Sequence, residues 1–474
     1  MHPPQPPDTA LLNPAPAPAS DTGPPQASPA LVDDAALARP RGPHRLVIIG
    51  GGAAGLELAA RLGHGVGRRG QAEVLLVDPF LTHVWKPLLH EMAAGTLRTH
   101  EGVVDFLPQA RRHHFRFHLG TMESLDRRRR QVRLAPLRDG DGMEIAPRRT
   151  VSYDTLVLCV GSVVNDFGIP GVCDHALRLD SAGDAGHLQR RLIATCLRAE
   201  FQEQGPVRMV IVGGGATGVE LAAELADALR EIAGYGPRLS RLKRPAHICI
   251  VETGPRLLAA LPPATAARAQ ADLEQRGVEV RLRARVAEVM AGRVQLATGE
   301  ALPADLTVWC AGIRGPDLLQ HLDGLALTSA RQVRVRPTLR TEGDEHIFAL
   351  GDCAHCSLAG APEGTTVPPR AQAAHQQARF LAGALPLHMA GRPLPAFRFR
   401  DYGALVSIGR STAVGSLVGQ ITGRRFNLHG ALARWSYRVQ QRRHLALLHG
   451  PARALLATLG GWLTGRSQPV VKLH

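Results

Sequence analysis

The chain is poor in aromatic residues and in cysteine, and each shortage limits the classes of protein to which it could belong. Among 474 residues there are four Trp, four Tyr and seven Cys. The cysteines are odd in number and scattered, which argues against a disulfide framework and favours a reducing compartment. The formal net charge of +15 would suit nucleic acid, an anionic membrane or a plain solvated surface. No nucleic-acid-binding module is present, so we expect no nucleic-acid partner.

The chain also lacks an apolar leader and an unbroken membrane-spanning run. Residues 1–43 are rich in Pro and Ala, a composition typical of a disordered extension rather than of a targeting segment. The stretch 445–463 has the length of a bilayer-spanning helix, but His449, Pro451 and Arg453 interrupt it. We therefore expect no transmembrane helix, and a chain of this length should form two or three domains.

A glycine-rich motif between a predicted strand and a predicted helix is the first strong signal. The apolar run 46–49 leads into G-x-G-x-x-G, whose first glycine allows a tight turn and whose second leaves room for a pyrophosphate. The third glycine lets helix and strand pack closely, and the free N–H groups of the helix start face the phosphates. A second strand, 73–77, ends in an acid that can hydrogen-bond a ribose. The residues predicted to bind this dinucleotide are Gly50, Gly52, Ala53, Ala54, Gly55 and Asp78.

The same motif recurs after the apolar run 207–212, and apolar residues at helical spacing follow it over 221–232. The next strand, 248–251, ends in Glu252, which can accept hydrogen bonds from adenine-ribose hydroxyls and would repel a 2′-phosphate. NADH is therefore favoured over NADPH, although Arg256 lies four residues further on. Two intact motifs predict two dinucleotides, and alternating strand and helix signals predict an α/β fold with two Rossmann-like domains. The residues predicted to bind the second dinucleotide include Gly213, Gly215, Thr217 and Gly218.

Two connecting stretches have patterns of their own. Residues 115–160 have the pattern of a β-meander, with strands predicted at 116–119, 131–134 and 156–160 and a closing Gly161. Residues 85–95 read as a short helical segment. It is either a plain connection or a loop beside a flavin, with Lys86, His90 and Glu91 as its polar members.

Two further strand ends carry small or acidic residues. The stretch 305–313 is a buried strand that runs into a small-residue turn, where Gly312 would allow close approach of a nicotinamide ring. Asp352 ends another apolar strand and could hydrogen-bond a ribitol hydroxyl of FAD, or equally cap a following helix. Cys353 and Cys356 form a C-x-x-C without further ligands at plausible spacing. We expect no metal there and favour two buried or helix-start thiols.

Gln372 and Gln376 are spaced to lie on one face of a helix that opens near Pro368. Their amides could bind carbonyl oxygens of a flavin ring or a quinone, or could simply be solvated. Beyond Asp401, the last acidic residue, the chain turns basic, and Arg434, Arg438 and Arg442 form one helical stripe. Basic amphipathic helices with interfacial Trp lie on anionic membranes. The alternative is a pair of helices packed on the core or at a dimer interface.

Together these motifs resemble the bacterial type II NADH dehydrogenases, the non-proton-pumping NADH:quinone oxidoreductases. The resemblance covers about residues 44–474. Its most specific pieces are IIGGGAAGLELA, HVWKPLLHEMAAGTL, VIVGGGATGVELAAEL, IFALGDCA and VPPRAQAAHQQA. It implies non-covalent FAD, NADH as substrate and a membrane quinone as acceptor. It also implies a peripheral position on the cytoplasmic face of the bacterial inner membrane, reached through C-terminal helices.

The resemblance also assigns residues and domains. The family pattern A-Q-x-A-x-Q falls on Gln372 and Gln376, which implies that they lie at the quinone end of the flavin, and a family glutamate falls on Glu220. These three are the predicted catalytic residues. Lys86, Gly161, Asp352 and Gln372 are predicted for FAD, and Gly312 for NADH. The predicted parts are a tail (1–43), an FAD-binding domain (44–166 and 333–400), an NADH-binding domain (167–332) and a C-terminal membrane-anchoring region (401–474).

Two alternative functions stay open from sequence. An enzyme of the same fold that oxidises sulfide would need a cysteine pair beside the flavin and no working NADH site. Cys159 and Cys353 would allow the first, but Gly213, Gly215, Gly218 and Glu252 argue against the second. A non-catalytic, redox-sensing flavoprotein that binds NADH belongs to another class. The sequence does not distinguish ubiquinone from menaquinone, and a homodimer also stays open.

Overall fold

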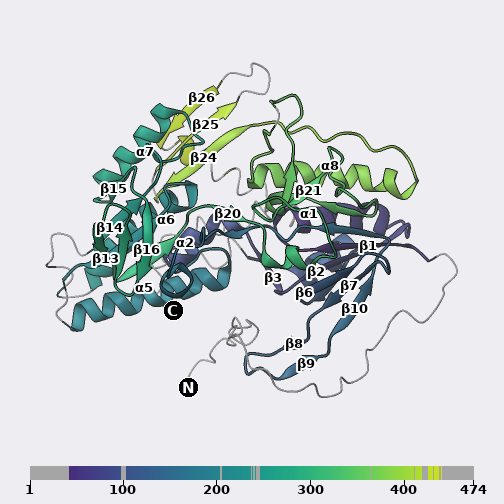
Figure 1. Ribbon diagram of the computed structural model, residues 1–474, viewed down its shortest axis with the longest axis horizontal. Helices are drawn as coiled ribbons and strands as arrows, with labels where there is room; N and C mark the ends of the chain where they lie inside the picture. The colour runs from purple at the N-terminus through teal and green to yellow at the C-terminus, as the bar shows by residue number, and fades with distance from the viewer. Residues whose placement is uncertain are drawn as a thin grey trace, which may run out of the picture. The chain divides into compact units, whose positions relative to one another are not determined.

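The computed structural model describes most of the chain (Figure 1). The described residues are 42–97, 103–202, 205–235, 238, 241, 246–362, 364–409, 412–418, 425–430, 432–436 and 439. Nearly all of the predicted tail 1–43, and the predicted helical stretch 452–463, lie outside them.

The chain folds into two compact units, each built from separate stretches. The first comprises residues 1–83, 104–162 and 314–399, and the second comprises 84–103, 163–313 and 400–474. Each unit therefore contains one of the two glycine motifs. The functional domain assignments made from sequence stay predictions.

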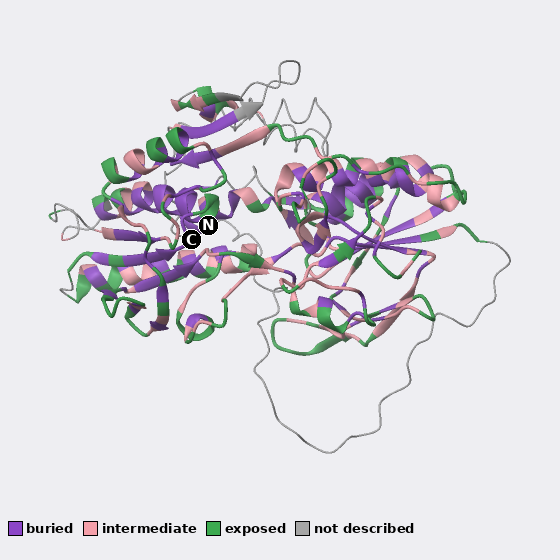
Figure 2. Cartoon of the chain, turned by 45° about the horizontal axis from the view of Figure 1, so that its top comes forward, coloured by how far each residue is buried: buried purple, intermediate pink, exposed green. Residues whose placement is uncertain are grey.

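The first unit is organised around a five-stranded parallel sheet with the order β22-β11-β1-β2-β5. Continuous apolar runs form its central strands because a parallel sheet is buried on both faces, and these strands are buried (Figure 2). Helices α1 and α8 pack against each other beside this sheet. The bounds are β1 His44–Ile49, α1 Ala53–Leu62, β2 Ala72–Asp78, β5 Arg116–Leu119, β11 Thr155–Leu158, β22 Ile347–Ala349 and α8 Ala371–Met389.

The predicted β-meander over 115–160 is only partly correct. Its first and last strands, β5 and β11, join the parallel sheet, and only the strands between them form an antiparallel sheet, β10-β7-β6, and a hairpin, β8-β9. All four residues of β11 are buried, and such a run without polar alternation is typical of a central parallel strand. The bounds are β6 Met122–Asp126, β7 Gln131–Leu134, β8 Leu137–Arg138, β9 Glu144–Ala146 and β10 Arg149–Ser152.

The second unit repeats the plan with a four-stranded parallel sheet, β15-β14-β13-β19. The apolar stripe predicted over 221–232 is confirmed, because Leu221, Leu225 and Leu229 of α6 are buried in the core. An antiparallel sheet, β16-β17-β18, completes this part. The bounds are α5 Ala182–Phe201, β13 Val207–Val212, α6 Ala216–Tyr235, β14 Ala246–Val251, α7 Pro263–Gln275, β15 Glu279–Arg281, β16 Val286–Met290, β17 Arg293–Leu296, β18 Ala301–Pro303 and β19 Leu306–Trp309.

The predicted membrane-anchoring region 401–474 begins as a sheet. Strands β24 (Gly403–Ile408), β25 (Thr412–Val418) and β26 (Arg425–His429) pair antiparallel. Val406 and Ile408 belong to the core of the second unit, together with α6 residues. This part of the region is therefore integral to the fold.

Short elements connect these sheets. They are η2 Gly63–Gly67, β3 Thr82–Val84, η3 Lys86–Leu88, α2 Leu89–Ala93, β4 Val103–Asp105, α3 Phe106–His113, β12 Val163–Val164, α4 Val172–His175, β20 Ile313–Arg314, η5 Asp317–His321, β21 Val333–Val335, η6 Gly351–Cys353 and β23 Ala354–Cys356.

Candidate cofactor and substrate sites

The three motif glycines of the first unit have three different physical reasons to be glycine. Gly50 has φ +101°, and a Cβ there would lie 2.4 Å from the carbonyl oxygen of Cys159. A Cβ at Gly55 would lie 1.9 Å from the carbonyl oxygen of Gly50, so this glycine permits the close packing of α1 on β1. A Cβ at Gly52 would meet nothing within 4 Å. Protein packing does not require glycine at position 52, whereas a phosphate beside the backbone would.

The second unit repeats this geometry. Gly213 has φ +112°, with its hypothetical Cβ 2.8 Å from the amide nitrogen of Ala311, and the Cβ of residue 218 would lie 2.0 Å from the carbonyl oxygen of Gly213. Gly215 again faces open space, and Thr217 is exposed in the first turn of α6. In the first unit, Ala53 is partly exposed at the start of α1, and Ala54 is buried. Both units thus present an open helix N-terminus, which suits a pyrophosphate.

The acidic residues at the carboxyl ends of β2 and β14 accept hydrogen bonds from the glycine-motif loops. Asp78 accepts hydrogen bonds from the N–H groups of Gly51 (2.6 Å) and Phe80 (2.9 Å). Burial raises the pKa of Asp78 to about 6, and these two donors oppose the shift. A carboxylate has about four acceptor sites, so hydrogen bonding to a ribose stays compatible with this loop-holding role.

Glu252 holds the second loop in the same way. It accepts from the N–H groups of Gly214 and Gly254, each at 2.6 Å. Arg256, which the sequence left as a candidate for a 2′-phosphate, instead donates to the backbone carbonyls of Leu261 and Ala259. Its guanidinium is thus engaged by the protein itself.

Asp352 lies inside the 3-10 turn η6, and a strand, β23, follows it. The alternative that it caps a following helix is therefore wrong. The Oγ of Ser162 donates to Asp352 at 3.1 Å, and the side-chain amide of Gln332 donates to its backbone carbonyl at 2.8 Å. Gly161 precedes this serine with φ +68°. The aspartate is thus held at the carboxyl edge of the parallel sheet, where such sheets bind ligands.

Helix α8 begins at Ala371, after the predicted start at Pro368. Gln372 and Gln376 are both partly exposed on it. The following residue, Gln377, was missed by sequence reasoning although it is buried, and its Oε1 accepts from the N–H of Gly351 at 2.7 Å. The N-terminal turns of α8 are therefore tied directly to the η6 turn that carries Asp352.

The two glycine motifs continue into two matching glutamates with opposite environments. Glu57 follows Gly55 by two residues, as Glu220 follows Gly218, and sequence reasoning singled out only the second. Glu57 is 3% exposed and contacts His375, Arg61 and Arg379. Burial alone would raise the pKa of Glu57, but the hydrogen bonds and charges of His375 and Arg61 lower it to about 2.

Glu220 has no such set of cations. It accepts a hydrogen bond from the N–H of Ser407 at 3.0 Å, and the Nδ1 of His90 lies 3.6 Å from its Oε2. Burial raises the pKa of Glu220 to about 8, and the charge of Glu91 adds to the shift, whereas Ser407 and Arg434 oppose it. Burial also lowers the pKa of His90 to about 3, so its imidazole is neutral near pH 7. Glu220 is therefore mainly protonated near neutral pH.

Comparison with known proteins places this geometry in a family. Residues 44–378 match the family model described as pyridine nucleotide-disulphide oxidoreductase. Over 446 residues the chain is 36% identical to a type II NADH:quinone oxidoreductase of Haemophilus influenzae, which covers 90% of this chain and 99% of the relative. A demethylphylloquinone reductase of Synechocystis is 30% identical over 380 residues, covering 79% of this chain and 87% of that one. The chain belongs to the type II NADH:quinone oxidoreductase family.

Solved structures share the fold of this family member. NDH2 from Plasmodium falciparum, in complex with RYL-552, superposes with a TM-score of 0.74 at 18% identity, covering 91% of this chain and 100% of that one. The sulfide:quinone oxidoreductase of Aquifex aeolicus superposes with a TM-score of 0.66 at 18% identity, covering 86% and 92%. The predicted family and the predicted α/β fold are both confirmed.

Family membership leaves several predicted site residues untested. Lys86 and Glu220 belong to the second unit, whereas Asp352, Gln372 and Gln376 belong to the first. The role of Lys86 beside the flavin thus stays a prediction, and within its own unit its charge opposes the burial that raises the pKa of Asp180.

The space beside Gly312 is occupied by protein. This residue has φ +64°, and its hypothetical Cβ would lie 2.4 Å from the ring of Phe167. Approach of a nicotinamide to Gly312 would therefore require Phe167 to move. The ring is 60% exposed, so little packing opposes such a movement.

The cysteines do not form an exposed redox pair. Cys353 and Cys356 are buried, as predicted, and burial raises the pKa of Cys353 to about 12. Cys159 is also buried, and burial raises its pKa well above the usual value. High thiol pKa values suppress the thiolate that attacks sulfur substrates. Within the described part of the chain, no three metal-binding side chains cluster.

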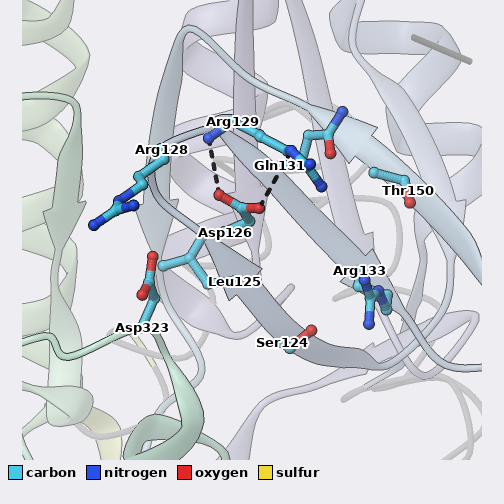
Figure 3. A pocket seen from close by; sticks show the side chains of 9 residues that line it. All are labelled: Ser124, Leu125, Asp126, Arg128, Arg129, Gln131, Arg133, Thr150 and Asp323. Carbon is cyan, nitrogen blue, oxygen red and sulfur yellow. Dashed lines mark hydrogen bonds and ion pairs between the residues drawn. The ribbon is translucent and has the colours of Figure 1, made fainter.

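A separate hollow of about 460 Å³ lies in the first unit and contains none of the predicted site residues (Figure 3). It is lined by Ser124, Leu125, Asp126, Arg128, Arg129, Gln131, Arg133, Thr150 and Asp323. Two carboxylates among the three arginines make it a mixed-charge surface rather than a dinucleotide site.

Over the residues that the structure describes, no helix combines the length and the apolar character needed to cross a membrane.

Proposed function

We propose that this chain oxidises NADH and passes two electrons through FAD to a membrane quinone, without pumping protons. The observation that carries the proposal is that the two glycine turns have matching geometry, each with an open helix start that would suit a pyrophosphate. The chain also matches a type II NADH:quinone oxidoreductase over 99% of that relative's length. The sulfide-oxidising alternative is not favoured, because Cys159 and Cys353 are buried thiols of raised pKa.

The first unit supplies every residue proposed to bind FAD except Lys86, which belongs to the second unit. Bound FAD supplies a two-electron carrier that accepts hydride from NADH and is reoxidised by a quinone. The helix start at Gly52 would receive the pyrophosphate, Asp78 a ribose, and Asp352 the ribitol. The residues proposed to bind FAD are Gly50, Gly52, Ala53, Ala54, Gly55, Asp78, Lys86, Gly161, Asp352 and Gln372.

The second unit supplies the NADH site. Its open helix start at Gly215 would receive the pyrophosphate, and the carboxylate of Glu252 would accept from the adenine ribose and repel a 2′-phosphate. The engagement of Arg256 by backbone carbonyls supports the preference for NADH. The residues proposed to bind NADH are Gly213, Gly215, Thr217, Gly218, Glu252 and Gly312.

Gln372 and Gln376 are proposed to orient the quinone through their amides. Glu220 is proposed to hold a proton close to neutral pH, which its raised pKa supports. General acids work best when their pKa lies near the working pH, and reduction of a quinone to a quinol consumes protons.

One anaerobic mixing experiment tests the reaction. Purified protein with its bound FAD is mixed with NADH and then with a short-chain quinone while flavin absorbance is followed. We expect bleaching by NADH and rapid recovery with quinone. Bleaching without recovery would indicate that the flavoprotein uses another electron acceptor. Bleaching by sulfide but not by NADH would favour the sulfide-oxidising enzyme.

We also propose peripheral attachment to the cytoplasmic face of a bacterial inner membrane. Leu432 and Trp435 are 59% and 64% exposed, whereas Ala433 between them is buried. One apolar edge of this short helical stretch therefore faces outward, as in interfacial helices, and the sequence after Asp401 is basic. A homodimer is a further proposal, supported by the exposed Leu197 and Phe201 on one face of α5, and sedimentation velocity would test it.

A further inference from the structure

The buried glutamate of the first unit connects two helices. Glu57 lies on α1, and its Oε2 is 2.5 Å from the Nδ1 of His375 on α8. Its other oxygen accepts from Arg61 on its own helix at 2.8 Å and from Arg379 on α8 at 3.1 Å. One carboxylate therefore joins the helix that begins at the pyrophosphate motif to the helix that carries the paired glutamines.

Two contacts, made by residues only two positions apart, hold helix α8 on opposite sides of its axis. Successive residues of an α-helix are about 100° apart around its axis, so His375 and Gln377 point about 200° apart. His375 reaches Glu57, and Gln377 reaches the backbone of Gly351. Gln376 emerges between these two anchors, and Gln372 lies one turn earlier on the same edge. The anchors together fix the rotation of α8 and thus the direction of both glutamines.

The ionised state of Glu57 fixes which atom is the donor in its hydrogen bond with His375. The carboxylate stays ionised at any ordinary pH because its cationic partners outweigh burial. An ionised carboxylate can only accept hydrogen bonds, so the Nδ1 of His375 must carry the proton, and the ring orientation is fixed. Breaking a buried pair by removing one partner is strongly unfavourable because the other charge is left uncompensated. The contact therefore resists rotation of the helix.

We propose that Glu57 and His375 are positioning residues for quinone reduction, which set the rotation of α8 so that Gln372 and Gln376 face the acceptor. This inference rests on the proposed function, because it assigns those glutamines to the quinone. It concerns the second half-reaction only. NADH binding uses groups of the other unit, and the residues proposed to bind FAD, apart from Gln372, lie outside α8. Hydride transfer should therefore depend much less on the pair.

Stopped-flow measurement on the FAD-loaded protein separates the two half-reactions. In Glu57→Gln and His375→Leu, we expect reoxidation of the reduced flavin by decylubiquinone to slow about tenfold. A displacement of about 1 Å in a positioning group can cost about 100-fold. Flavin reduction by NADH should change less than about twofold. The dissociation constant of decylubiquinone, measured by quenching of flavin fluorescence at equilibrium, should rise by a similar factor and provides a readout independent of turnover.

Two matched variants complete the test. Arg61→Gln removes a partner of the same carboxylate that belongs to α1 itself, and it should leave reoxidation nearly unchanged. His375→Asn keeps a donor at the position of Nδ1 and should restore most of the rate lost in His375→Leu. Equal slowing of both half-reactions, or equal defects in His375→Asn and His375→Leu, would reduce the pair to a general stability role and overturn the inference. If quinone does not reoxidise the flavin of the unsubstituted protein, the proposed function fails instead.

Discussion

At the scale of single residues, the partners of a side chain decide its chemistry more than the motif around it does. Glu57 and Glu220 occupy the same place after two nearly identical glycine motifs. His375 and Arg61 lower the pKa of the first to about 2, whereas burial raises that of the second to about 8. The motif alone could not predict this difference, because His375, whose hydrogen bond lowers the pKa of Glu57 most, lies 318 residues away in sequence.

The raised pKa of Glu220 predicts a pH dependence of stability. Its usual pKa is 4.5, so between about pH 4.5 and 8 the unfolded chain releases a proton that the folded protein keeps. This contribution is complete below pH 4.5 and is lost as the pH rises to about 8, by up to about 1.4 kcal/mol per pH unit.

Urea unfolding of the unsubstituted protein and of Glu220→Gln across this range checks the prediction. The amide mimics the neutral acid, so the extra decrease should vanish in the variant. The comparison cancels the opposite slope from His90, whose lowered pKa makes stability rise with pH up to about 6.5. Parallel curves for the two proteins would show that Glu220 is ionised.

The negative charge of Glu252 is expected to make the protein prefer NADH over NADPH. Glu252→Gln keeps an oxygen acceptor for one of the two loop N–H groups and removes the charge that repels a 2′-phosphate. We expect the ratio of kcat/KM for NADH over NADPH to fall about tenfold, equivalent to about 1.4 kcal/mol. Arg256→Gln is the control and should leave the ratio unchanged, since this side chain is engaged by backbone carbonyls. An unchanged ratio in Glu252→Gln would remove the residue from the site.

At the scale of elements, the strand–turn–helix units show which glycines serve the fold and which serve the ligand. Gly55→Ala places a methyl group 1.9 Å from the carbonyl oxygen of Gly50, whereas Gly52→Ala meets nothing within 4 Å. We expect the first to destabilise the apoprotein by at least about 2 kcal/mol, because overpacked sites relax only at a cost. The second should unfold like the unsubstituted protein but bind FAD at least tenfold more weakly. Thermal unfolding without FAD and titration with FAD check both. Equal FAD affinity in Gly52→Ala would argue against a pyrophosphate at this turn.

Elements that carry their own local signal were the ones that sequence could predict. Both glycine motifs, their helices and the apolar strands before them follow from spacing alone. The membership of β5 and β11 in the parallel sheet did not. The meander prediction ignored the continuous burial of β11, and β5, an edge strand with an alternating exposed pattern, has no such signal. Gln377 escaped notice for a different reason. A glutamine that accepts from a distant backbone N–H leaves no periodic trace in sequence.

At the scale of the whole molecule, the C-terminal region both completes a core and carries the proposed membrane contact. Removing everything after residue 400 would take away Val406 and Ile408, which are buried in the second unit. Such a truncation would therefore lose the fold along with any membrane contact and would report nothing about attachment. A surface substitution is the sharper experiment.

The double variant Leu432→Ser with Trp435→Ser removes two exposed apolar side chains without touching that core. Burial of apolar surface is worth about 25 cal/mol per Å², so its loss should weaken binding to vesicles at least tenfold. Met143→Ser in the first unit removes another side chain of similar exposure, 71%, and should bind normally. Cosedimentation with phosphatidylglycerol-containing vesicles measures both variants. NADH oxidation with a water-soluble acceptor should stay intact in both, because neither substitution touches the glycine motifs. Vesicle binding that survives the double variant would move the attachment surface away from this stretch of the chain.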